Sequence, residues 1–406
     1  MALLRGGFVV MLAVAALVGA CGIVIGLEPP QETQRPPPPL PPPPPPPILD
    51  PCAHTGAPAK PATDDDPSAA VPPFWLAMRA TRIAGDAGVR GFDLDGVCTC
   101  DHSEKAAHDG GASCLPRGGA AVECDDDGGV DNAAERVFRS AGAFADPNAG
   151  LAKDIGNGQK TMLIYVANYN GKKNDADVTV GFALSDGLLT NECDPALEVE
   201  PGDAGTCEAG AYCTPTWRGC DRWHPAQNAL IPLPPPDSVI PLRNGKAYVT
   251  DGVLVATGNA DIPFFINKTS MLITGPTFTA RLEEVMPLSP THPRRFRMRE
   301  ALLGGRLPLD DLARVLWEGS FGDFFFCESL GIYKETMRQA CPHVDTNKFT
   351  GLDFQEGLAC NAMSLGIPVD MALADIDLGA RVAPTNTPNE RCVGKPVPAL
   401  SETCPP

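Results

Sequence analysis

The sequence predicts a mainly β protein, a disulfide-rich antiparallel β-sandwich followed by a small C-terminal α-helical subdomain. Three observations predict this fold class. The 406 residues include 44 prolines and 41 glycines, which indicates many turns and a low helix content. Short runs of β-branched and aromatic residues alternate with turn residues, as in antiparallel strands joined by hairpins. The chain also has 15 cysteines and an export-type leader, and disulfides persist in exported proteins.

The first 20 residues have the features of an export signal. Arg5 is the only charged residue before the apolar run 8–27, and small residues precede Cys21. The four residues 18–21, Val-Gly-Ala-Cys, resemble the bacterial lipobox, in which the cysteine is lipidated and becomes the first mature residue. The resemblance covers the leader only and implies a signal peptide at 1–20 with lipid attachment at Cys21.

An uncleaved membrane helix is the alternative to lipid attachment, since the apolar run has the roughly 20 residues needed to cross a bilayer. Both alternatives export the chain from Glu28 onward and anchor it to a membrane. Gly22, where an aspartate would favour the inner membrane, favours the outer membrane of a bacterial cell envelope by analogy with enteric lipoproteins.

Residues 21–71 are predicted to contain the lipid-anchor site and a proline-rich disordered linker. Positions 36–47 hold 11 prolines, a composition typical of an extended polyproline II segment. At ~3.1 Å per residue this segment would span about 37 Å. We therefore expect a spacer between anchor and body. The alternative, a ligand for a proline-recognising domain, is chiefly an intracellular device.

The cysteines other than Cys21 are even in number, so all of them can pair in an oxidising compartment. They form two groups of four, one group of five and a single residue: Cys98, Cys100, Cys114 and Cys124; Cys193, Cys207, Cys213 and Cys220; Cys327, Cys341, Cys360, Cys392 and Cys404; and Cys52. If each group of four pairs internally, Cys52 pairs with one of the last five. A zinc site that includes Cys98 and Cys100 is the alternative, but the paired C-x2-C spacing is missing.

Residues 72–290 are predicted to form the sandwich. The segment 160–187 indicates two strands around the polar turn "NGKKNDAD", with alternate apolar positions of 178–184 on one face. Two further hairpins are predicted with turns at residues 251–252, Asp-Gly, and 275–276, Gly-Pro.

Residues 291–406 are predicted to be a helical, cysteine-rich subdomain. The stretch "LPLDDLARVLWEG" (307–319) spaces its apolar residues at helical intervals and has acidic residues in its first turn. Two more helices are predicted at about 329–340 and 354–365.

Two acidic stretches are candidate calcium sites, because carboxylate and amide oxygens are the hard ligands that calcium prefers. In "FDLDG" and "ECDDDGGVDN" the candidate ligands are Asp93, Asp95, Asp125, Asp127, Asp131 and Asn132. The stretch "DTNKFTGLDFQE" resembles an EF-hand loop, with candidate ligands Asp345, Asn347, Asp353 and Glu356. Phe349 and Thr350 depart from the EF-hand pattern, and Asp and Gly also build turns without a metal. Calcium is the only candidate cofactor.

The cysteine-rich loop 207–228 concentrates aromatic residues. Tyr212, Trp217 and Trp223 are candidates for stacking on a sugar or a partner protein, because rigid aromatic side chains bring a large contact area at low entropic cost. The alternative is that they fill the inside of a disulfide-tied loop.

The net charge of −18 argues against a nucleic-acid partner, since affinity for phosphates rests on Lys and Arg. The sequence lacks the G-x-S-x-G, H-E-x-x-H and phosphate-binding glycine motifs, so no catalytic residue is assigned. The sequence therefore predicts an exported, membrane-anchored lipoprotein with a binding or envelope-structural role, whose partner is a cell-surface glycan or an envelope protein. A calcium-assisted carbohydrate-binding protein and a secreted hydrolase with an unrecognised site are the alternatives.

Overall fold

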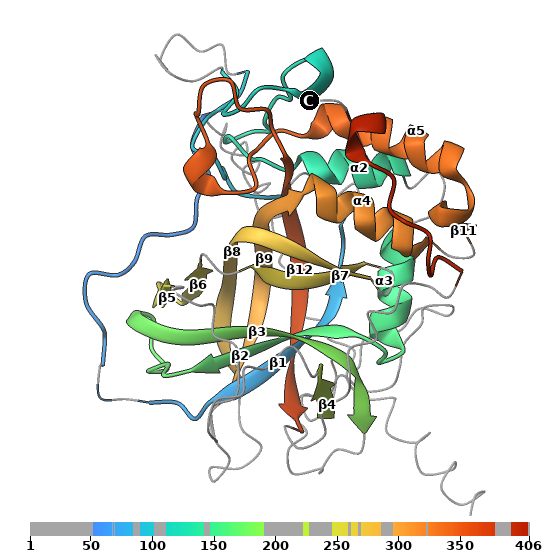
Figure 1. Cartoon of the computed structure of the whole chain (residues 1–406). Coiled ribbons are helices and arrows are strands. Elements are labelled where there is room, and N and C mark those ends of the chain that lie inside the picture. The colour runs from blue at the N-terminus through green and yellow to red at the C-terminus, as the bar shows by residue number, and fades with distance from the viewer. Residues whose placement is uncertain are drawn as a thin grey trace, which may run out of the picture. The chain divides into compact units, whose positions relative to one another are not determined.

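The computed structural model describes much of the chain that follows the proline-rich segment (Figure 1). The described residues are 52–66, 68, 70–83, 90–100, 111–141, 147–190, 222–226, 246–258, 261–266, 269–285, 295–321, 324–377 and 391–404. The predicted signal peptide, Cys21 and the linker up to residue 51 lie outside them. From Leu49 onward the chain belongs to one compact unit.

Strands form most of the regular structure, which confirms the prediction of a mainly β protein. The strands are β1 (Phe74–Thr81), β2 (Thr161–Ala167), β3 (Asp175–Thr190), β4 (Arg222–Pro225), β5 (Lys246–Thr250), β6 (Val253–Thr257), β7 (Ile262–Ile266), β8 (Thr269–Val285), β9 (Arg295–Pro308), β10 (Ser320–Phe321), β11 (Phe324–Phe325) and β12 (Ala362–Ile376). The α-helices are α2 (Ala133–Ala141), α3 (Pro147–Gly156), α4 (Leu309–Glu318) and α5 (Leu330–Ala340). Short 3-10 helices are η1 (Arg117–Gly119), η3 (Phe326–Glu328), η4 (Cys341–His343), η5 (Thr350–Leu352) and η6 (Leu400–Glu402).

Eight of these strands pair in a closed ring. In chain order β1, β2, β3, β5, β6, β8, β9 and β12 each pair antiparallel with the next, and β12 pairs with β1. Strand β4 lies between β3 and β12, and β7 pairs with the first part of β8. The predicted sandwich is not confirmed, because the pairs β1–β12 and β3–β5 join into one sheet what would be two separate sheets.

The inside of the closed sheet is a hydrophobic core. Alternate residues of a strand point to the same face, so Leu76, Ile164 and Phe278 from different strands are buried in one cluster. The shared face predicted for 178–184 is confirmed, since its first three alternate residues belong to the cluster and Leu184 packs against it. Closed sheets of this strand number are narrow enough to be filled by side chains.

The turn chemistry explains two hairpins and corrects a third. Strands β2 and β3 are confirmed, as are β5 and β6, which are joined by Asp251 and Gly252 with φ of 49° and 79°, the geometry of a tight hairpin turn. The turn predicted at residues 275–276 is wrong. Strand β8 continues through these residues with a register shift between Thr274 and Thr277. A bulge tolerates a proline, which has no N–H to donate to the ladder.

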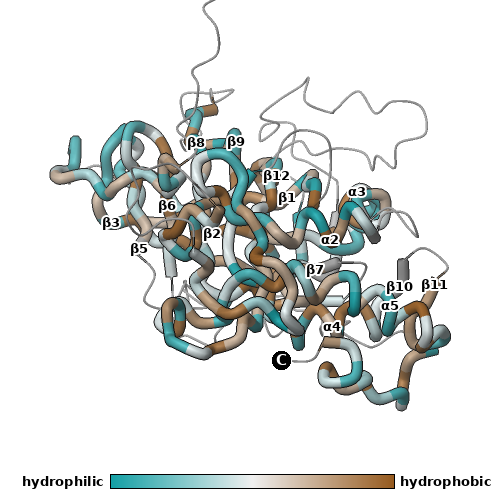
Figure 2. The backbone as a smooth tube through the Cα atoms, turned by 90° about the horizontal axis from the view of Figure 1, so that it is seen from above, coloured by the Kyte–Doolittle hydropathy of each residue, from teal (hydrophilic) through white to brown (hydrophobic). Residues whose placement is uncertain are grey.

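Helices α2, α4 and α5 lie at one end of the closed sheet (Figure 1). The helices predicted at 307–319 and 329–340 are confirmed as α4 and α5. Helix α4 contains both hydrophobic and hydrophilic residues (Figure 2), and its hydrophobic side chains are buried. No helix among the described residues is long and apolar enough to span a membrane.

The helix predicted at 354–365 is wrong, because β12 begins at Ala362. Most positions of β12 are buried, so its apolar residues do not alternate and their pattern cannot distinguish a buried strand from a helix. Strands β9 and β12 therefore place much of 291–406 in the same sheet as the strands of 72–290.

Five disulfides are described: Cys52–Cys98, Cys100–Cys124, Cys114–Cys360, Cys327–Cys392 and Cys341–Cys404. The prediction of disulfides is confirmed for these cysteines, whereas Cys193, Cys207, Cys213 and Cys220 lie outside the described residues. The expectation that Cys52 pairs with the C-terminal region is wrong. Instead, Cys114–Cys360 makes that link, across 246 residues. Cys98 and Cys100 are both oxidised and so do not act as zinc thiolates in this structure.

Candidate metal centre

The predicted calcium-binding stretches around residues 92–96, 123–132 and 345–356 are separate in the sequence but meet at one place. We define the acidic cluster as Asp93, Asp95, Asp125, Asp131, Asp345 and Asp353. The charge of Asp95 contributes to raising the pKa of Asp125, Asp131 and Asp345, so these carboxylates interact with one another. One carboxylate oxygen from each of Asp93, Asp95 and Asp131 lies within 4.8 Å of the others. The structure thus forms one candidate site where the sequence suggested two.

A pair of glycines makes room for the segment that leads into the cluster. Gly304 of β9 and Gly366 of β12 are partners in the register. A Cβ atom on Gly366 would lie 1.9 Å from the carbonyl oxygen of Arg90, and one on Gly304 would lie 2.3 Å from the ring of Phe92. Only glycine at these positions allows residues 90–92 to lie directly on the two strands.

A tight turn at residues 126–130 brings the acidic stretch 123–132 against the segment that carries Asp93. Asp126 and Val130 exchange backbone hydrogen bonds of 3.0 and 3.2 Å around two glycines with φ of 81° and 69°. The N–H of Asp131 then donates to the carbonyl of Phe92 at 3.0 Å. The turn therefore places Asp125 and Asp131, which flank it, beside the segment that carries Asp93.

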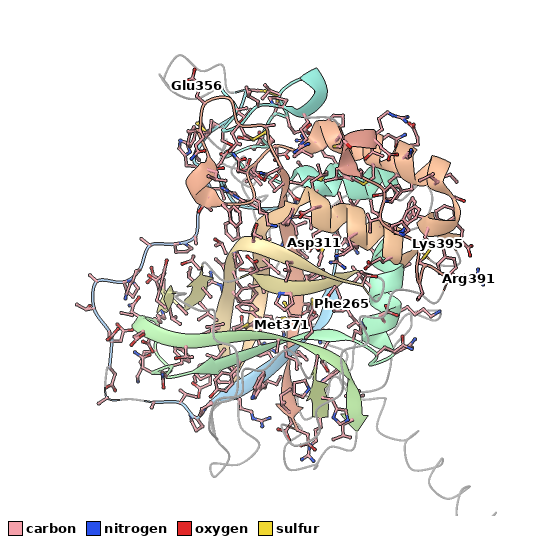
Figure 3. The ribbon with its side chains drawn as sticks, viewed as in Figure 1. Phe265, Asp311, Glu356, Met371, Arg391 and Lys395 are labelled. Atoms are coloured by element: carbon pink, nitrogen blue, oxygen red, sulfur yellow. A yellow bond between two sulfur atoms is a disulfide. The ribbon has the colours of Figure 1, made fainter. Side chains whose placement is uncertain are left out.

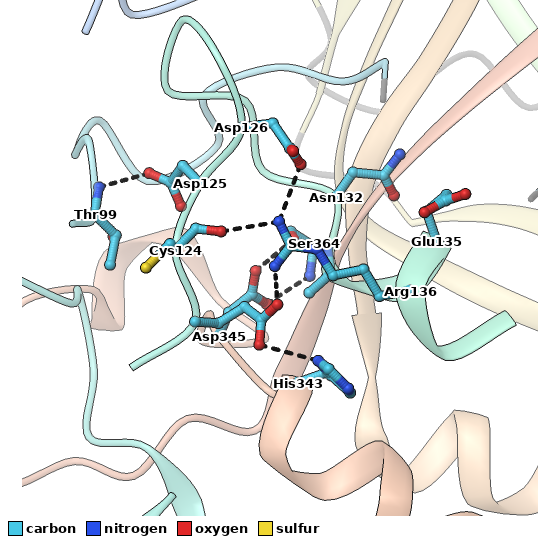
Figure 4. A network of polar contacts seen from close by, with 12 residues as sticks. Thr99, Cys124, Asp125, Asp126, Asn132, Glu135, Arg136, His343, Asp345 and Ser364 are labelled. Carbon is cyan, nitrogen blue, oxygen red and sulfur yellow. Dashed lines mark hydrogen bonds and ion pairs between the residues drawn. The ribbon is translucent and has the colours of Figure 1, made fainter. Parts of the chain in front are cut away.

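Backbone N–H groups orient four of the carboxylates. Gly96 donates to Asp93 at 2.6 Å, Val97 to Asp95 at 3.0 Å, Thr99 to Asp125 at 2.7 Å and Leu94 to Asp131 at 2.6 Å (Figure 4 shows the Thr99 bond). A carboxylate has about four acceptor sites, so one such donor does not saturate it.

Strand β12 and helix α2 hold Asp345. Ser364 of β12 donates to Asp345 from its backbone N–H at 2.8 Å and from its hydroxyl (Figure 4). The same hydroxyl oxygen accepts the N–H of Ala133, the first residue of α2, at 2.8 Å. One serine therefore joins the strand, the helix and the carboxylate.

Arg306 of β9 links the stretch around Leu94 to the acidic stretch 345–356. Its guanidinium donates to the carbonyl of Leu94 at 2.7 Å and to the carbonyl of Asn347 at 2.9 Å. It also pairs with Asp353 at 2.6 Å, and both side chains are buried, 1% and 6% exposed. Sequence reasoning missed this residue, although a lone arginine in the apolar run "LLGGRLP" was the available signal.

Burial is the main cause of unusual pKa values in the cluster. Burial, together with the nearby charges of Asp95, Asp345 and Asp125, raises the pKa of Asp131 to about 11. It also raises the pKa of Asp125 to about 7 and that of Asp345 to about 6. Burial raises the pKa of Asp353 as well, but Arg306 opposes that shift.

Two buried side-chain oxygen atoms in the stretch 345–356 lack a hydrogen-bond donor. Within the described part of the chain, no donor reaches Asn347 Oδ1 or Asp353 Oδ1. Asn347 is 0% exposed, and its side-chain amide nitrogen is already engaged with the carbonyl of Leu352 at 3.2 Å. Asn347 adjoins the cluster, because its side chain is one of the groups that lower the pKa of Asp353.

Three predicted ligands do not join the cluster. The side-chain amide of Asn132 donates to the carbonyls of Arg90 and Gly366 at 2.8 and 3.0 Å. Asp127 is exposed at the tip of the glycine turn, and Glu356 is exposed on an outer loop (Figure 3). The EF-hand interpretation of 345–356 is also wrong, because a strand rather than a helix follows the loop. The remaining predicted ligands are brought together through tertiary contacts instead of a local calcium loop.

The first described segment of the chain is fastened beside the cluster. His54 Nδ1 lies 2.6 Å from Asp93 Oδ2, and the carbonyl of Thr55 accepts the N–H of Asp93 at 2.7 Å. The N–H of Thr55 donates to the carbonyl of Gly128 at 2.8 Å. With the disulfide Cys52–Cys98, these bonds attach the segment to both acidic loops.

The aromatic candidates do not form an exposed platform in the described part of the loop. Trp223 is 1% exposed and packs with Ala77, Leu163 and Ala183 on the outer face of the sheet. It therefore acts as filling, and its role as an exposed sugar-stacking residue is contradicted. Tyr212 and Trp217 lie outside the described residues.

Comparison of the chain with models of protein families, with curated proteins and with solved structures found no match.

Proposed function

We propose that the protein is an exported lipoprotein of the bacterial cell envelope, anchored through Cys21 to the outer membrane, with a binding or structural role. The observation that carries this proposal is the pairing of the described cysteines in five disulfides. Such density is expected of a protein that folds outside the reducing cytosol. The lipobox-like residues 18–21 supply the means of attachment.

The closed sheet supports a role in presentation or scaffolding. Its interior is a continuous hydrophobic core, while disulfides and polar bonds hold the loops at one end. Functional residues are commonly carried by loops that a rigid scaffold positions. We therefore expect an envelope partner, a glycan or a protein, to contact these loops.

The test is metabolic labelling with an alkyne fatty acid, combined with the intact mass of the unreduced protein. We expect the wild type to carry the label, to begin at Cys21 and to lack free thiols. Cys21→Ser should lose the label, whereas the neighbouring substitution Gly22→Ala should keep it. Residues 1–20 retained without a lipid would contradict lipid anchoring, and free thiols throughout the native protein would contradict export.

A further inference from the structure

The acidic cluster contains more negative charge than nearby cations neutralise. Arg306 pairs with Asp353, and His54 Nδ1 lies 2.6 Å from Asp93 Oδ2. The other four carboxylates have no ion pair among the described residues. Arg136 and His343 interact electrostatically with Asp345, but their described ion pairs are with Glu123, outside the cluster. Arg136 also pairs with Asp126, which is outside the cluster too (Figure 4). Burying several like charges is costly unless they take up protons or bind a cation.

One buried side-chain oxygen of Asn347 and one of Asp353 also lack a hydrogen-bond donor. A side-chain amide oxygen cannot relieve its own desolvation by taking up a proton at neutral pH, unlike a carboxylate. Leaving such an acceptor buried without a donor costs about 1–3 kcal/mol. The side chain of Asn347 lies beside the carboxylate of Asp353, which also has one oxygen without a donor. A cation that faces both oxygens would explain this arrangement.

We propose that the acidic cluster is a calcium-binding site, with ligand oxygens from its carboxylates and from the side-chain amide of Asn347. The spacing fits, because two oxygens bound to one calcium ion at about 2.4 Å lie at most about 4.8 Å apart. The oxygens of Asp93, Asp95 and Asp131 meet that limit. This inference goes beyond the proposed function, which requires no metal.

The chemistry of the donor set favours calcium over other divalent cations. All the proposed ligand atoms are hard oxygens, whereas zinc prefers nitrogen and sulfur. The sulfur atoms beside these residues, of Cys52, Cys98 and Cys114, are all in disulfides. Calcium accepts six to eight oxygens in irregular geometry, and magnesium demands a near-ideal octahedron. A cluster assembled from three separate loops suits the more tolerant ion.

Calcium at this site would join three segments that no single secondary-structure element connects. These segments are the stretch that follows residues 90–92, the glycine turn before α2, and the loop that precedes β12. The ion would replace the protons that the cluster otherwise needs, and it would fix the loops against the end of the sheet. Its role is therefore structural stabilisation of the loop end.

The test is isothermal titration of the full mature protein, disulfides intact, with calcium chloride after removal of metals by chelation. The wild type should bind calcium with a Kd of millimolar or below, as extracellular calcium sites do. Asp131→Asn and Asn347→Leu should weaken binding by about tenfold or more, because each removes one ligand oxygen. Asp127→Asn and Glu356→Gln also replace a carboxyl group by an amide but lie on the surface, and they should leave Kd within about twofold.

Two results would overturn the proposal. One is the absence of binding heat at calcium concentrations up to about 10 mM. The other is an equal loss of affinity in the surface variants and the cluster variants, which indicates diffuse attraction to an acidic protein. Asp131→Asn replaces the carboxyl group by a neutral amide of the same size and so is expected to fold. It decides the question if Asn347→Leu does not fold.

Discussion

The core of the closed sheet is buried and the acidic cluster is at least partly buried, yet opposite kinds of interaction hold the two regions. Inside the sheet, Leu76, Phe182 and Phe278 pack with other apolar side chains and require no partner of opposite charge. In the cluster, Asp131 is 2% exposed among other carboxylates. Apolar burial stabilises the first region, whereas burial alone destabilises the second. The second region must therefore be held by covalent links, by Arg306 and, as we propose, by calcium.

The disulfide Cys114–Cys360 provides the largest expected effect. Replacing both cysteines by alanine frees a loop of 246 residues and should lower the free energy of unfolding by about 5.5 kcal/mol in the chain-entropy description. The matched double variant of Cys100 and Cys124, separated by 24 residues, should cost about 3.5 kcal/mol. Urea unfolding at constant pH and calcium concentration measures both losses. Equal losses would show that loop length does not set the stability of this end.

Arg306→Met tests whether one buried cation holds the loops together. The change leaves the buried Asp353 without its partner and two carbonyls without a donor, so we expect a loss of about 3–5 kcal/mol. Arg299→Met, also on β9, removes a partly exposed arginine 3.8 Å from Glu283 and should cost less than about 1 kcal/mol. The comparison uses chemical denaturation. Similar losses would contradict the central role of Arg306.

Gly366→Ala tests the contact between the two regions. The new methyl group would collide with the carbonyl of Arg90, so we expect a loss of about 1–3 kcal/mol, the usual cost of overpacking. Gly351→Ala is the matched control, because no atom lies within 4 Å of the added Cβ. It should change stability by less than about 0.5 kcal/mol. Equal effects would show that residues 90–92 shift aside freely.

The pH dependence of the calcium-free protein should sharpen the contrast further. The pKa is raised by burial to about 7 for Asp125 and to about 6 for Asp345, from 3.8, so the folded protein holds more protons than the unfolded chain. Asp131, whose pKa is raised to about 11, acts in the same direction over a wider range. Stability should therefore fall as pH rises from about 4 to about 7, by at least about 1–2 kcal/mol after allowance for solvent screening, and should continue to fall above pH 7. Saturating calcium should remove the fall. Denaturation at several pH values, with and without chelator, measures it.

Asp131→Asn is the control for this pH profile. It removes the carboxyl group whose pKa is raised to about 11, and with it the proton that this group takes up on folding, so it should flatten the profile in the calcium-free protein. The pKa of His343 is lowered by burial and contributes in the opposite direction, so the difference between variant and wild type isolates the cluster. A wild-type profile that rises with pH would contradict the assignment of the cluster as its source.

The two regions also differ in how far the sequence predicts them. Period-two patterns and the Asp251-Gly252 turn were sufficient for the hairpins, because those signals are local. Closure of the sheet depends on β1 pairing with β12, which is nearly 300 residues away, and no local pattern records it. The continuous burial of β12 further conceals its strand period.

For the cluster, the residue types were predictable but the arrangement was not. Six of the predicted acidic ligands converge, because calcium chemistry and turn chemistry both select Asp. Their union depends on Arg306 and Gly304 of β9, which lie far from the acidic stretches in the sequence, and on Gly366 of β12, which faces Gly304. The disulfide of Cys52 was likewise mispredicted, since spacing does not determine connectivity.

The disulfide between Cys52 and Cys98 also has a mechanical consequence. It closes a covalent loop that contains β1, the strand that completes the sheet through β12. A pull from the N-terminal side of Cys52 passes through the two sulfur atoms to Cys98 and does not travel along β1. Tension on a tether would therefore reach the acidic loops first and leave the closing strand unloaded.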